Sequence, residues 1–255
     1  MSDKGDKSRF GAGTRTQTEQ ESVQLLEEGF SESPFSPYEM MANFPMYVQR
    51  QDMARFLSRY EIFKRVLEIQ GSIIECGVLF GGGLMSFAQL SAIFEPVNHQ
   101  RRIIGFDTFE GFPHLGDKDQ HSASGAAHVG GLAVDSYDEI LRCAELYDMN
   151  RFVGHIPKVE LVRGDAAETI PKYVEEHPQL IVSLLYLDFD IYEPTRAALE
   201  HFVPRMPKGA IIAFDELNNV DWAGETVAAL EAFDLNKLRI ERFAFGSMIS
   251  FAQIE

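Results

Sequence analysis

Two pairs of acidic residues follow apolar runs and together have the chemistry of a metal site. Asp188 and Asp190 close the run IVSLLYLDFD, and Asp215 and Glu216 follow the run AIIAF. Side chains alternate along a strand, so Asp188 and Asp190 are expected to point to the same side. Carboxylates this close repel one another and take up protons unless a cation lies among them. Hard oxygen ligands suit magnesium, calcium or manganese, so the pattern predicts a divalent-cation site.

These acids have a simpler interpretation as solvated turn residues and a helix cap, positions in which Asp is common. That interpretation is sufficient for any one of them. It is less satisfactory for two pairs that end two strand-like runs, because ligands of an open parallel sheet bind just beyond the carboxyl ends of its strands. We therefore favour a binding site.

Strand-like and helical segments alternate along the chain and must position these acids. Short apolar runs typical of strands occur at 72–76, 102–106, 159–162, 181–187 and 210–214, with a closing pair expected at 238–242 and 248–252. Helical patterns lie between them at 84–94, 136–146, 168–177, 192–202 and 224–233. The alternation predicts an α/β fold with a mostly parallel sheet and helices on both faces.

A glycine-rich turn separates the first strand from the first of these helices. It contains Gly77 and the triplet 81–83. Such a turn lets a ligand approach the backbone closely and presents the N–H groups of a helix N-terminus. The spacing is not the G-x-G-x-x-G dinucleotide pattern. The acidic Glu75 beside the turn also argues against a pyrophosphate ligand.

The second strand ends in Asp107, an acid in a position suited to a ribose diol. A long loop rich in Gly, His and Ser follows, through Gly131. Loops of this length are usually functional lids or disordered segments. The loop carries His114, His121 and His128, each readily explained as a solvated histidine. Because histidine titrates near neutral pH, one of them could instead act as a base.

The N-terminal part of the chain differs in composition from the rest. Residues 1–35 are polar and predict a flexible arm, although the apolar positions among residues 23–30 could form a short docked helix. Residues 36–70 predict a helical segment or lid, and residues 71–255 an α/β domain. We expect three parts with these boundaries.

Apolar residues recur every three or four positions between 56 and 67, which marks the packed face of a helix. Arg50, Arg55 and Arg59 lie in the same segment. Spaced charges of this kind usually form a solvated helix face. The alternative is that one of the three meets an anionic group of a substrate.

The composition excludes several classes of function. The 255 residues carry a net charge of −16, so nucleic-acid binding is not expected. Cys76 and Cys143 are too few for a disulfide framework or a zinc finger. No apolar stretch is long enough to cross a membrane, and the first residues lack a signal-peptide pattern. We expect a cytoplasmic protein that binds neither nucleic acid nor membrane.

Four ordered motifs resemble a single family. They are Glu75-Cys76-Gly77-Val78-x-x-Gly81-Gly82, Asp107-x-Phe109-Glu110-Gly111-x-Pro113, Leu187-Asp188-x-Asp190-x-Tyr192-Glu193-x-Thr195 and Asp215-Glu216. Together they are similar to the macrocin O-methyltransferase family (TylF, MycF and NovP type) over about residues 45–255. The resemblance implies the Rossmann-like class I methyltransferase fold with an N-terminal helical extension. It also implies methylation of sugar hydroxyls in antibiotic biosynthesis.

The resemblance further implies S-adenosylmethionine as the methyl donor and a divalent metal, usually Mg²⁺. The residues that would line the donor are Glu75, Gly77 and Gly81 at its methionine part, Asp107 at its ribose, and Gly164 with Asp165 beside its adenine.

The acids match the family's metal ligands and base. By the resemblance, Asp188, Asp215 and Glu216 would bind the metal, and Asp190 would be the general base, with the loop histidine His128 as the alternative. Glu216 stands where the family usually has Asp. A metal chelated by two vicinal hydroxyls lowers the pKa of the attacking one. A small sugar-containing acceptor is therefore expected, and we expect a homo-oligomer.

Two rival functions remain open at this point. The first is an NAD(P)-dependent Rossmann oxidoreductase, which the glycine spacing and the clustered acids disfavour. The second is a methyltransferase-like binding module without catalytic activity, which the intact acids disfavour.

Overall fold

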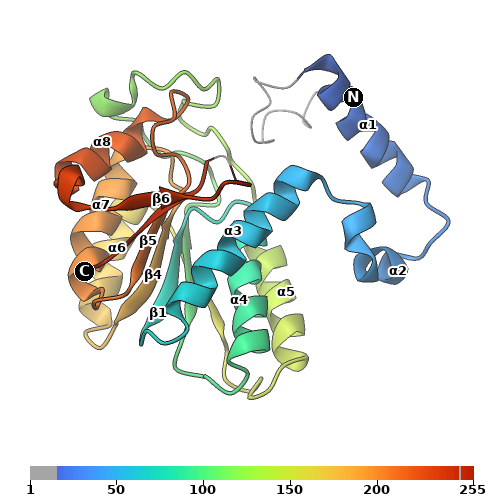
Figure 1. The fold of residues 1–255 in the computed structure, drawn as a ribbon, viewed down its shortest axis with the longest axis horizontal. Helices are drawn as coiled ribbons and strands as arrows, with labels where there is room; N and C mark the ends of the chain where they lie inside the picture. The colour runs from blue at the N-terminus through green and yellow to red at the C-terminus, as the bar shows by residue number, and fades with distance from the viewer. Residues whose placement is uncertain (1–15, 247) are drawn as a thin grey trace. The chain divides into compact units, whose positions relative to one another are not determined.

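The computed structural model describes residues 16–246 and 248–255, and these form a seven-stranded sheet (Figure 1). The strands are β1 Ser72–Cys76, β2 Ile103–Asp107, β3 Val159–Arg163, β4 Val182–Leu187, β5 Ile211–Phe214, β6 Ile240–Arg242 and β7 Ser250–Gln253. Their order across the sheet is β3-β2-β1-β4-β5-β7-β6. The first five strands pair in parallel, and β7 runs antiparallel to β5 and β6. The predicted mostly parallel sheet is confirmed.

Helices cover both faces of this sheet, as predicted (Figure 1). On one face lie α4 Gly82–Phe94, α5 Tyr137–Met149 and the later turns of α3 Arg50–Val66. On the other lie α6 Ala166–Glu176, α7 Tyr192–Phe202 and α8 Ala223–Ala232. Short 3₁₀ turns occur at η2 Phe44–Met46, η3 Asp117–Asp119, η4 Val203–Arg205 and η5 Leu235–Lys237.

The central strands are buried throughout, and their side chains alternate between the two faces. Ile73 of β1 and Leu184 of β4 face the cluster beneath α3, α4 and α5. Ile74 and Leu185 face the cluster beneath α6, α7 and α8. The apolar runs of the sequence are therefore strands covered on both sides, as is usual in parallel sheets.

The register of the central strands brings their carboxyl ends to one edge. Cys76 pairs with Leu187, and Leu187 pairs with Phe214. The ladder continues one step further, because Asp188 N donates to Cys76 O at 2.7 Å and Asp215 N donates to Leu187 O at 3.0 Å. Asp188 and Asp215 therefore follow directly after the last residues of β4 and β5.

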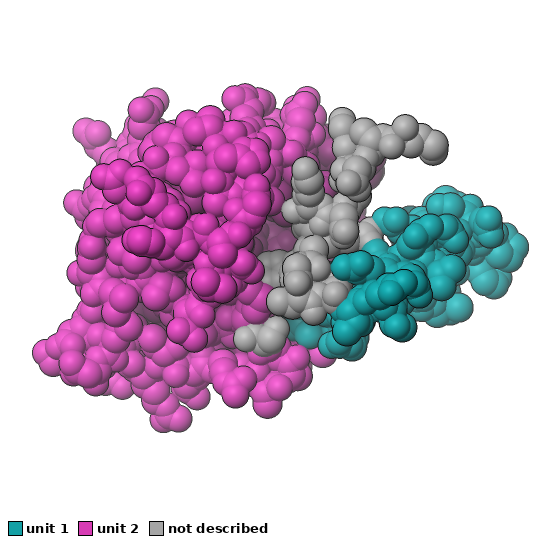
Figure 2. All heavy atoms as spheres, turned by 90° about the horizontal axis from the view of Figure 1, so that it is seen from above, with its two compact units in different colours: residues 1–55 teal, residues 56–255 magenta. Residues whose placement is uncertain are grey.

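The chain divides into two compact units between Arg55 and Phe56, within α3 (Figure 2). The first unit contains α1 Gln17–Ser31 and α2 Pro37–Ala42. Thr16 and Ser36 begin these helices with capping boxes. The structure therefore forms a helix within the predicted arm, and residues 1–15 of that arm lie outside the described residues. The expected three-part division remains a prediction.

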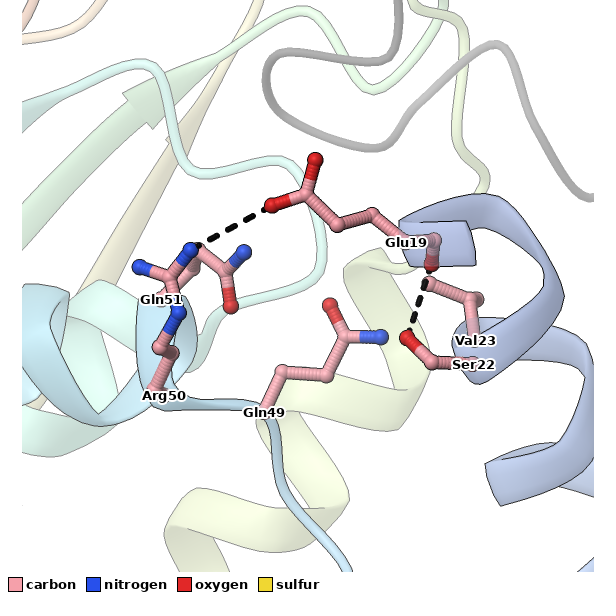
Figure 3. A pocket seen from close by; sticks show the side chains of 6 residues that line it. All are labelled: Glu19, Ser22, Val23, Gln49, Arg50 and Gln51. Carbon is pink, nitrogen blue, oxygen red and sulfur yellow. Dashed lines mark hydrogen bonds and ion pairs between the residues drawn. The ribbon is translucent and has the colours of Figure 1, made fainter. Parts of the chain in front are cut away.

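A hollow of about 200 Å³ lies among the described residues of the first unit. It is lined by Glu19, Ser22, Val23, Gln49, Arg50 and Gln51 (Figure 3). Arg50 Nη2 lies 3.4 Å from Glu19 Oε1 across it. Every residue predicted to hold the donor or the metal lies instead in the second unit. None of the described helices combines the length and the apolar character needed to cross a membrane.

Candidate functional site

The glycine turn after β1 touches the end of β4. Gly77 has φ of +89°, and a Cβ at this position would lie 1.9 Å from the carbonyl oxygen of Asp188. Only glycine permits this approach and this backbone conformation together. Gly81, with φ of +81°, precedes α4 in the left-handed conformation, and Ile140 fills the space where its Cβ would stand. The turn predicted to bind the donor and the first acid of β4 are therefore in backbone contact.

Asp107 shapes the same turn. Its Oδ2 accepts hydrogen bonds from Val78 N at 2.7 Å and Leu79 N at 3.0 Å, and its Oδ1 accepts one from Phe109 N at 2.7 Å. A carboxylate can accept about four hydrogen bonds, so acceptor capacity remains for a ribose hydroxyl. The predicted ribose contact is compatible with this arrangement and stays a prediction.

Arg59 is buried beside Glu75, so the expectation of a solvated face is wrong for this arginine. Its exposed fraction is 6%, and its Nη2 lies 3.4 Å from Glu75 Oε1 and 3.9 Å from Asp188 Oδ2. Its guanidinium carbon stands 4.6 Å from the centre of the Tyr186 ring. Gly83 makes room for the pair, because a Cβ there would lie 1.9 Å from Glu75 Oε1.

Sheet alternation explains why these groups meet. Glu75 pairs with Tyr186 in the register, and both point to the face that α3 covers. Asp215 follows Ala213 on the same face, and its Oδ1 accepts a hydrogen bond from Tyr186 Oη at 2.6 Å. The burial of Arg59 could have been predicted from the sequence, because its spacing from Phe56 and Phe63 places it on the apolar face of the helix.

Glu216 follows Asp215 and is hydrogen-bonded to Glu225, a residue that sequence analysis did not select. Both side chains are buried, and Glu216 N donates to Glu225 Oε1 at 2.9 Å. Among the described residues Glu225 Oε2 has no hydrogen-bond partner. Burial raises the pKa of Glu225 well above its usual value; the Glu216 N–H lowers it, and the charges of Asp215, Glu216 and Asp188 raise it further. Three neighbouring carboxylates therefore act on the buried Glu225 side chain.

Asp190 occupies a strained turn between β4 and α7. Because β4 ends at Leu187, the strand alternation expected for Asp188 and Asp190 does not extend to them. Asp190 has φ of +65°, and Ile191 N donates to Phe189 O at 2.7 Å across it. A γ-turn with positive φ at its central residue is the rare, strained form. Strain of this kind persists only where the surroundings hold it.

The remaining predicted residues lie on the turn after β3 and on the long loop after β2. Gly164 N donates to Asp107 O at 2.9 Å, which joins its turn to the end of β2. Asp165 caps α6 by accepting from Ala167 N at 2.9 Å, and its Oδ2 lies 3.4 Å from His114 Nδ1. His128 is exposed on the long loop, with its Nδ1 3.0 Å from Val129 O.

The sequence profile of the macrocin-O-methyltransferase (TylF) family matches residues 47–238. The chain belongs to this family of O-methyltransferases. A tetracenomycin rhamnosyl 4'-O-methyltransferase of Streptomyces olivaceus is 28% identical over 152 residues, which cover 58% of this chain and 53% of that relative. The chain thus spans about half the length of the curated relative that it matches.

Solved structures of O-methyltransferases resemble most or nearly all of the chain. The calicheamicin methyltransferase CalS11 is 36% identical, with 99% of both chains covered and a TM-score of 0.90. A second structure of CalS11 is described as a TDP-rhamnose 3'-O-methyltransferase and matches with 34% identity, 94% and 95% coverage and a TM-score of 0.80. The O-methyltransferase NovP shares the fold at 20% identity, with 82% and 81% coverage and a TM-score of 0.62. The predicted family and its methyltransferase fold are confirmed.

The acidic residues of this TylF-family chain have the donor chemistry that a divalent cation prefers. Asp188, Asp215 and Glu216 supply hard oxygen donors at adjacent strand ends, and the orphaned Glu225 oxygen is buried among them. Across residues 16–246 and 248–255, however, no three His, Cys, Asp or Glu side chains are already arranged as a ligand group. The three acids therefore offer suitable donor atoms, and their role as metal ligands stays a prediction.

Proposed function

We propose that this protein transfers a methyl group from S-adenosylmethionine to a hydroxyl of a sugar, with a divalent cation, most suitably Mg²⁺, at Asp188, Asp215 and Glu216. The observation that carries the proposal is the contact between Gly77 and the Asp188 carbonyl. This contact joins a glycine turn suited to a donor and an acidic edge suited to a hydroxyl acceptor. Family membership supports methyl transfer and leaves the nicotinamide alternative without support.

The donor would bind along the glycine turn. Gly77 and Gly81 leave its backbone accessible, and the pairing of Glu75 with Arg59 holds a carboxylate ready for the amino group of the methionine part. The ribose would meet Asp107, and the adenine the turn of Gly164 and Asp165. The sulfonium of this donor needs no further activation, so the protein's task is to align an oxygen with the methyl carbon.

We infer a 6-deoxyhexose of the rhamnose type as the acceptor. The Streptomyces olivaceus relative acts on a rhamnosyl group, and CalS11 is described with TDP-rhamnose. Rhamnose offers vicinal hydroxyls that can chelate a cation. Whether the sugar is carried on a nucleotide or on a glycoside is an outcome of the test below.

The bound cation would lower the pKa of the acceptor hydroxyl and orient it. When bound, S-adenosylmethionine would supply the methyl group: the hydroxyl oxygen would bond to the methyl carbon as the S–CH₃ bond breaks, and S-adenosylhomocysteine would leave with the electron pair on sulfur. Asp190 takes the hydroxyl proton, with His128 as the alternative acceptor. General base catalysis of this kind contributes about a hundred- to ten-thousand-fold.

We also propose that the protein is a homo-oligomer. Within residues 16–55 the buried apolar side chains are Val23 and Met40. The exposed large apolar side chains of the same segment are Leu25, Phe30, Phe35, Tyr38, Met41, Phe44 and Met46. Apolar surface of this extent is typical of an interface. Light scattering of the full chain is expected to give a multiple of the monomer mass, and a monomer would contradict the proposal.

Methyl transfer to a defined sugar tests the function directly. Purified protein is incubated with methyl-labelled donor and TDP-rhamnose, and in parallel with rhamnosides, before and after metal removal. We expect label in one of these sugars, loss of transfer with EDTA and recovery with Mg²⁺, with little change in donor affinity. Full activity in metal-stripped protein would remove the cation from the mechanism. Binding of NAD(P) in place of the donor would overturn the function as a whole.

A further inference from the structure

The long loop between β2 and α5 contains a buried carboxylate that sequence analysis did not select. Asp119 has an exposed fraction of 3%. Its Oδ2 accepts a hydrogen bond from Gly116 N at 2.9 Å within the loop. Its Oδ1 accepts one from Tyr192 N at 2.8 Å, across 73 positions of sequence. A buried carboxylate oxygen that accepts a hydrogen bond from a backbone N–H far away in the sequence indicates that Asp119 holds two segments together.

Tyr192 is the first residue of α7, and this helix begins without a cap of its own. The N-cap residue Ile191 makes no side-chain hydrogen bond to the helix. The first N–H groups of a helix lack partners within it and carry partial positive charge. Asp119 supplies both the missing acceptor and the favourable negative charge, so it caps α7 from another part of the chain.

The capped residue, Tyr192, lies two positions after Asp190, and Asp190 occupies the strained turn already described. The positive φ of Asp190 and the Ile191–Phe189 hydrogen bond require the start of α7 to be held in place. Thr195 Oγ1 contributes by donating to Ile191 O at 2.8 Å. The Asp119 contact comes from outside this segment and reaches the backbone at Tyr192, beyond Ile191.

A third segment meets the same carboxylate. A Cβ at Gly224 would lie 2.3 Å from Asp119 Oδ1 and 2.4 Å from Tyr192 N. Gly224 immediately precedes Glu225, so the junction reaches the acidic edge as well. Around it, Ala123 N donates to Val220 O at 3.0 Å, and the rings of Phe112 and Trp222 stand 5.6 Å apart.

We propose that Asp119 is a positioning residue that fastens the β2–α5 loop to the start of α7 and thereby holds the Asp190 turn in its reactive geometry. The inference rests on the proposed function only in calling that geometry reactive. Three segments that carry the acceptor-side groups meet at this one carboxylate: the loop with His128, the turn with Asp190, and the start of α8 beside Glu225. In this role Asp119 acts through its contacts to Gly116 N and Tyr192 N.

The test uses the full-length protein with Asp119→Ala, which removes both acceptors, and Asp119→Asn, which can still accept from one N–H. Gly224→Ala disturbs the same junction and leaves the carboxylate in place. Asp117→Asn is the matched control, because Asp117 is exposed and bonds only to the Gln120 side chain among its side-chain contacts. Amide hydrogen exchange of the peptide covering residues 189–193 is measured with donor affinity and with turnover on TDP-rhamnose.

We expect exchange at 189–193 to accelerate at least tenfold in Asp119→Ala and Gly224→Ala, less in Asp119→Asn, and not in the control. Turnover number should fall about tenfold or more with little change in the acceptor KM or in the donor Kd. Unchanged exchange in Asp119→Ala overturns the proposal. Faster exchange with undiminished turnover also overturns it, because Asp119 would then only anchor the loop. If the wild-type protein methylates no sugar, the proposed function fails, and the exchange result still decides whether Asp119 holds the turn.

Discussion

The guanidinium of Arg59 and the carboxylate of Glu75 form a buried ion pair, with Nη2 and Oε1 separated by 3.4 Å. Their side chains are 7% and 2% exposed. The same guanidinium lies 3.9 Å from Asp188 Oδ2, so one cation faces both the acid proposed for the donor side and the first acid of the proposed metal set. This pair connects α3 to the carboxyl edge of the sheet and gives the two halves of the proposed site a common partner.

Replacing Arg59 by Met should destabilise the fold strongly. Removing one partner of a buried pair leaves an uncompensated charge, at a cost of about 3–5 kcal/mol. The contact of Arg59 with the Tyr186 ring is lost as well. Urea unfolding measures the change, and Arg50→Met is the control because that arginine is 79% exposed. Equal stabilities of the two variants would show that Glu75 does not depend on Arg59.

Asp107→Ala should weaken binding of S-adenosylmethionine. The change removes the proposed acceptor for the ribose and releases Val78 N and Leu79 N of the glycine turn and Phe109 N after β2. Loss of such hydrogen bonds costs about 1–3 kcal/mol of binding free energy. Calorimetric titration of the donor measures it, with Asp117→Ala as the exposed control. A dissociation constant equal to that of the wild type would remove Asp107 from the donor site.

Asp188→Asn and Asp190→Asn should lower methyl transfer in different ways. Asp188→Asn removes a ligand charge, so apparent Mg²⁺ affinity should fall and excess Mg²⁺ should recover part of the rate. Asp190→Asn keeps the ligands and loses the proton acceptor, so added Mg²⁺ should not restore a turnover number lowered about a hundredfold or more. Rates are measured across a Mg²⁺ titration beside His128→Ala. Normal turnover in Asp190→Asn with loss in His128→Ala would transfer the base role to the histidine.

Lys158 should make stability depend on pH in the alkaline range. Burial lowers its pKa from 10.5 to about 8, although its Nζ donates to Asn98 O at 2.6 Å. Between about pH 8 and 10.5 the unfolded chain binds more protons at this group than the folded chain, so its contribution to stability rises with pH there. Below pH 8 the buried charge is a cost.

The free energy of unfolding of Lys158→Met should therefore exceed that of the wild type by the most near pH 7. This difference should shrink by up to about 3 kcal/mol toward pH 10. Urea unfolding at the two pH values measures the difference. Lys172→Met is the control, because that lysine side chain is 74% exposed. A difference that does not vary with pH would contradict the lowered pKa.

Local patterns in the sequence were sufficient to predict the fold and much of the candidate site. Apolar runs such as that of β4 and the helical periods between them follow from side-chain alternation and helix geometry, which depend on neighbouring residues alone. Asp188 and Asp215 each follow directly after an apolar run. Because the two strands are parallel neighbours, both acids lie at the same edge of the sheet. The glycine turn with Gly77 was identified for the same reason, because its backbone requirement is local.

The tertiary structure alone decided which side chains meet. Arg59 is a charged residue on an apolar stripe, and its burial depends on Glu75 and Tyr186 arriving from two strands. Glu225 became part of the acidic edge only through the path of the chain after β5. The hydrogen bond from Tyr192 N to Asp119 spans 73 positions. Hydrogen bonds and ion pairs between distant segments leave no periodic signal, because their geometry exists only after the sheet and its helices have packed.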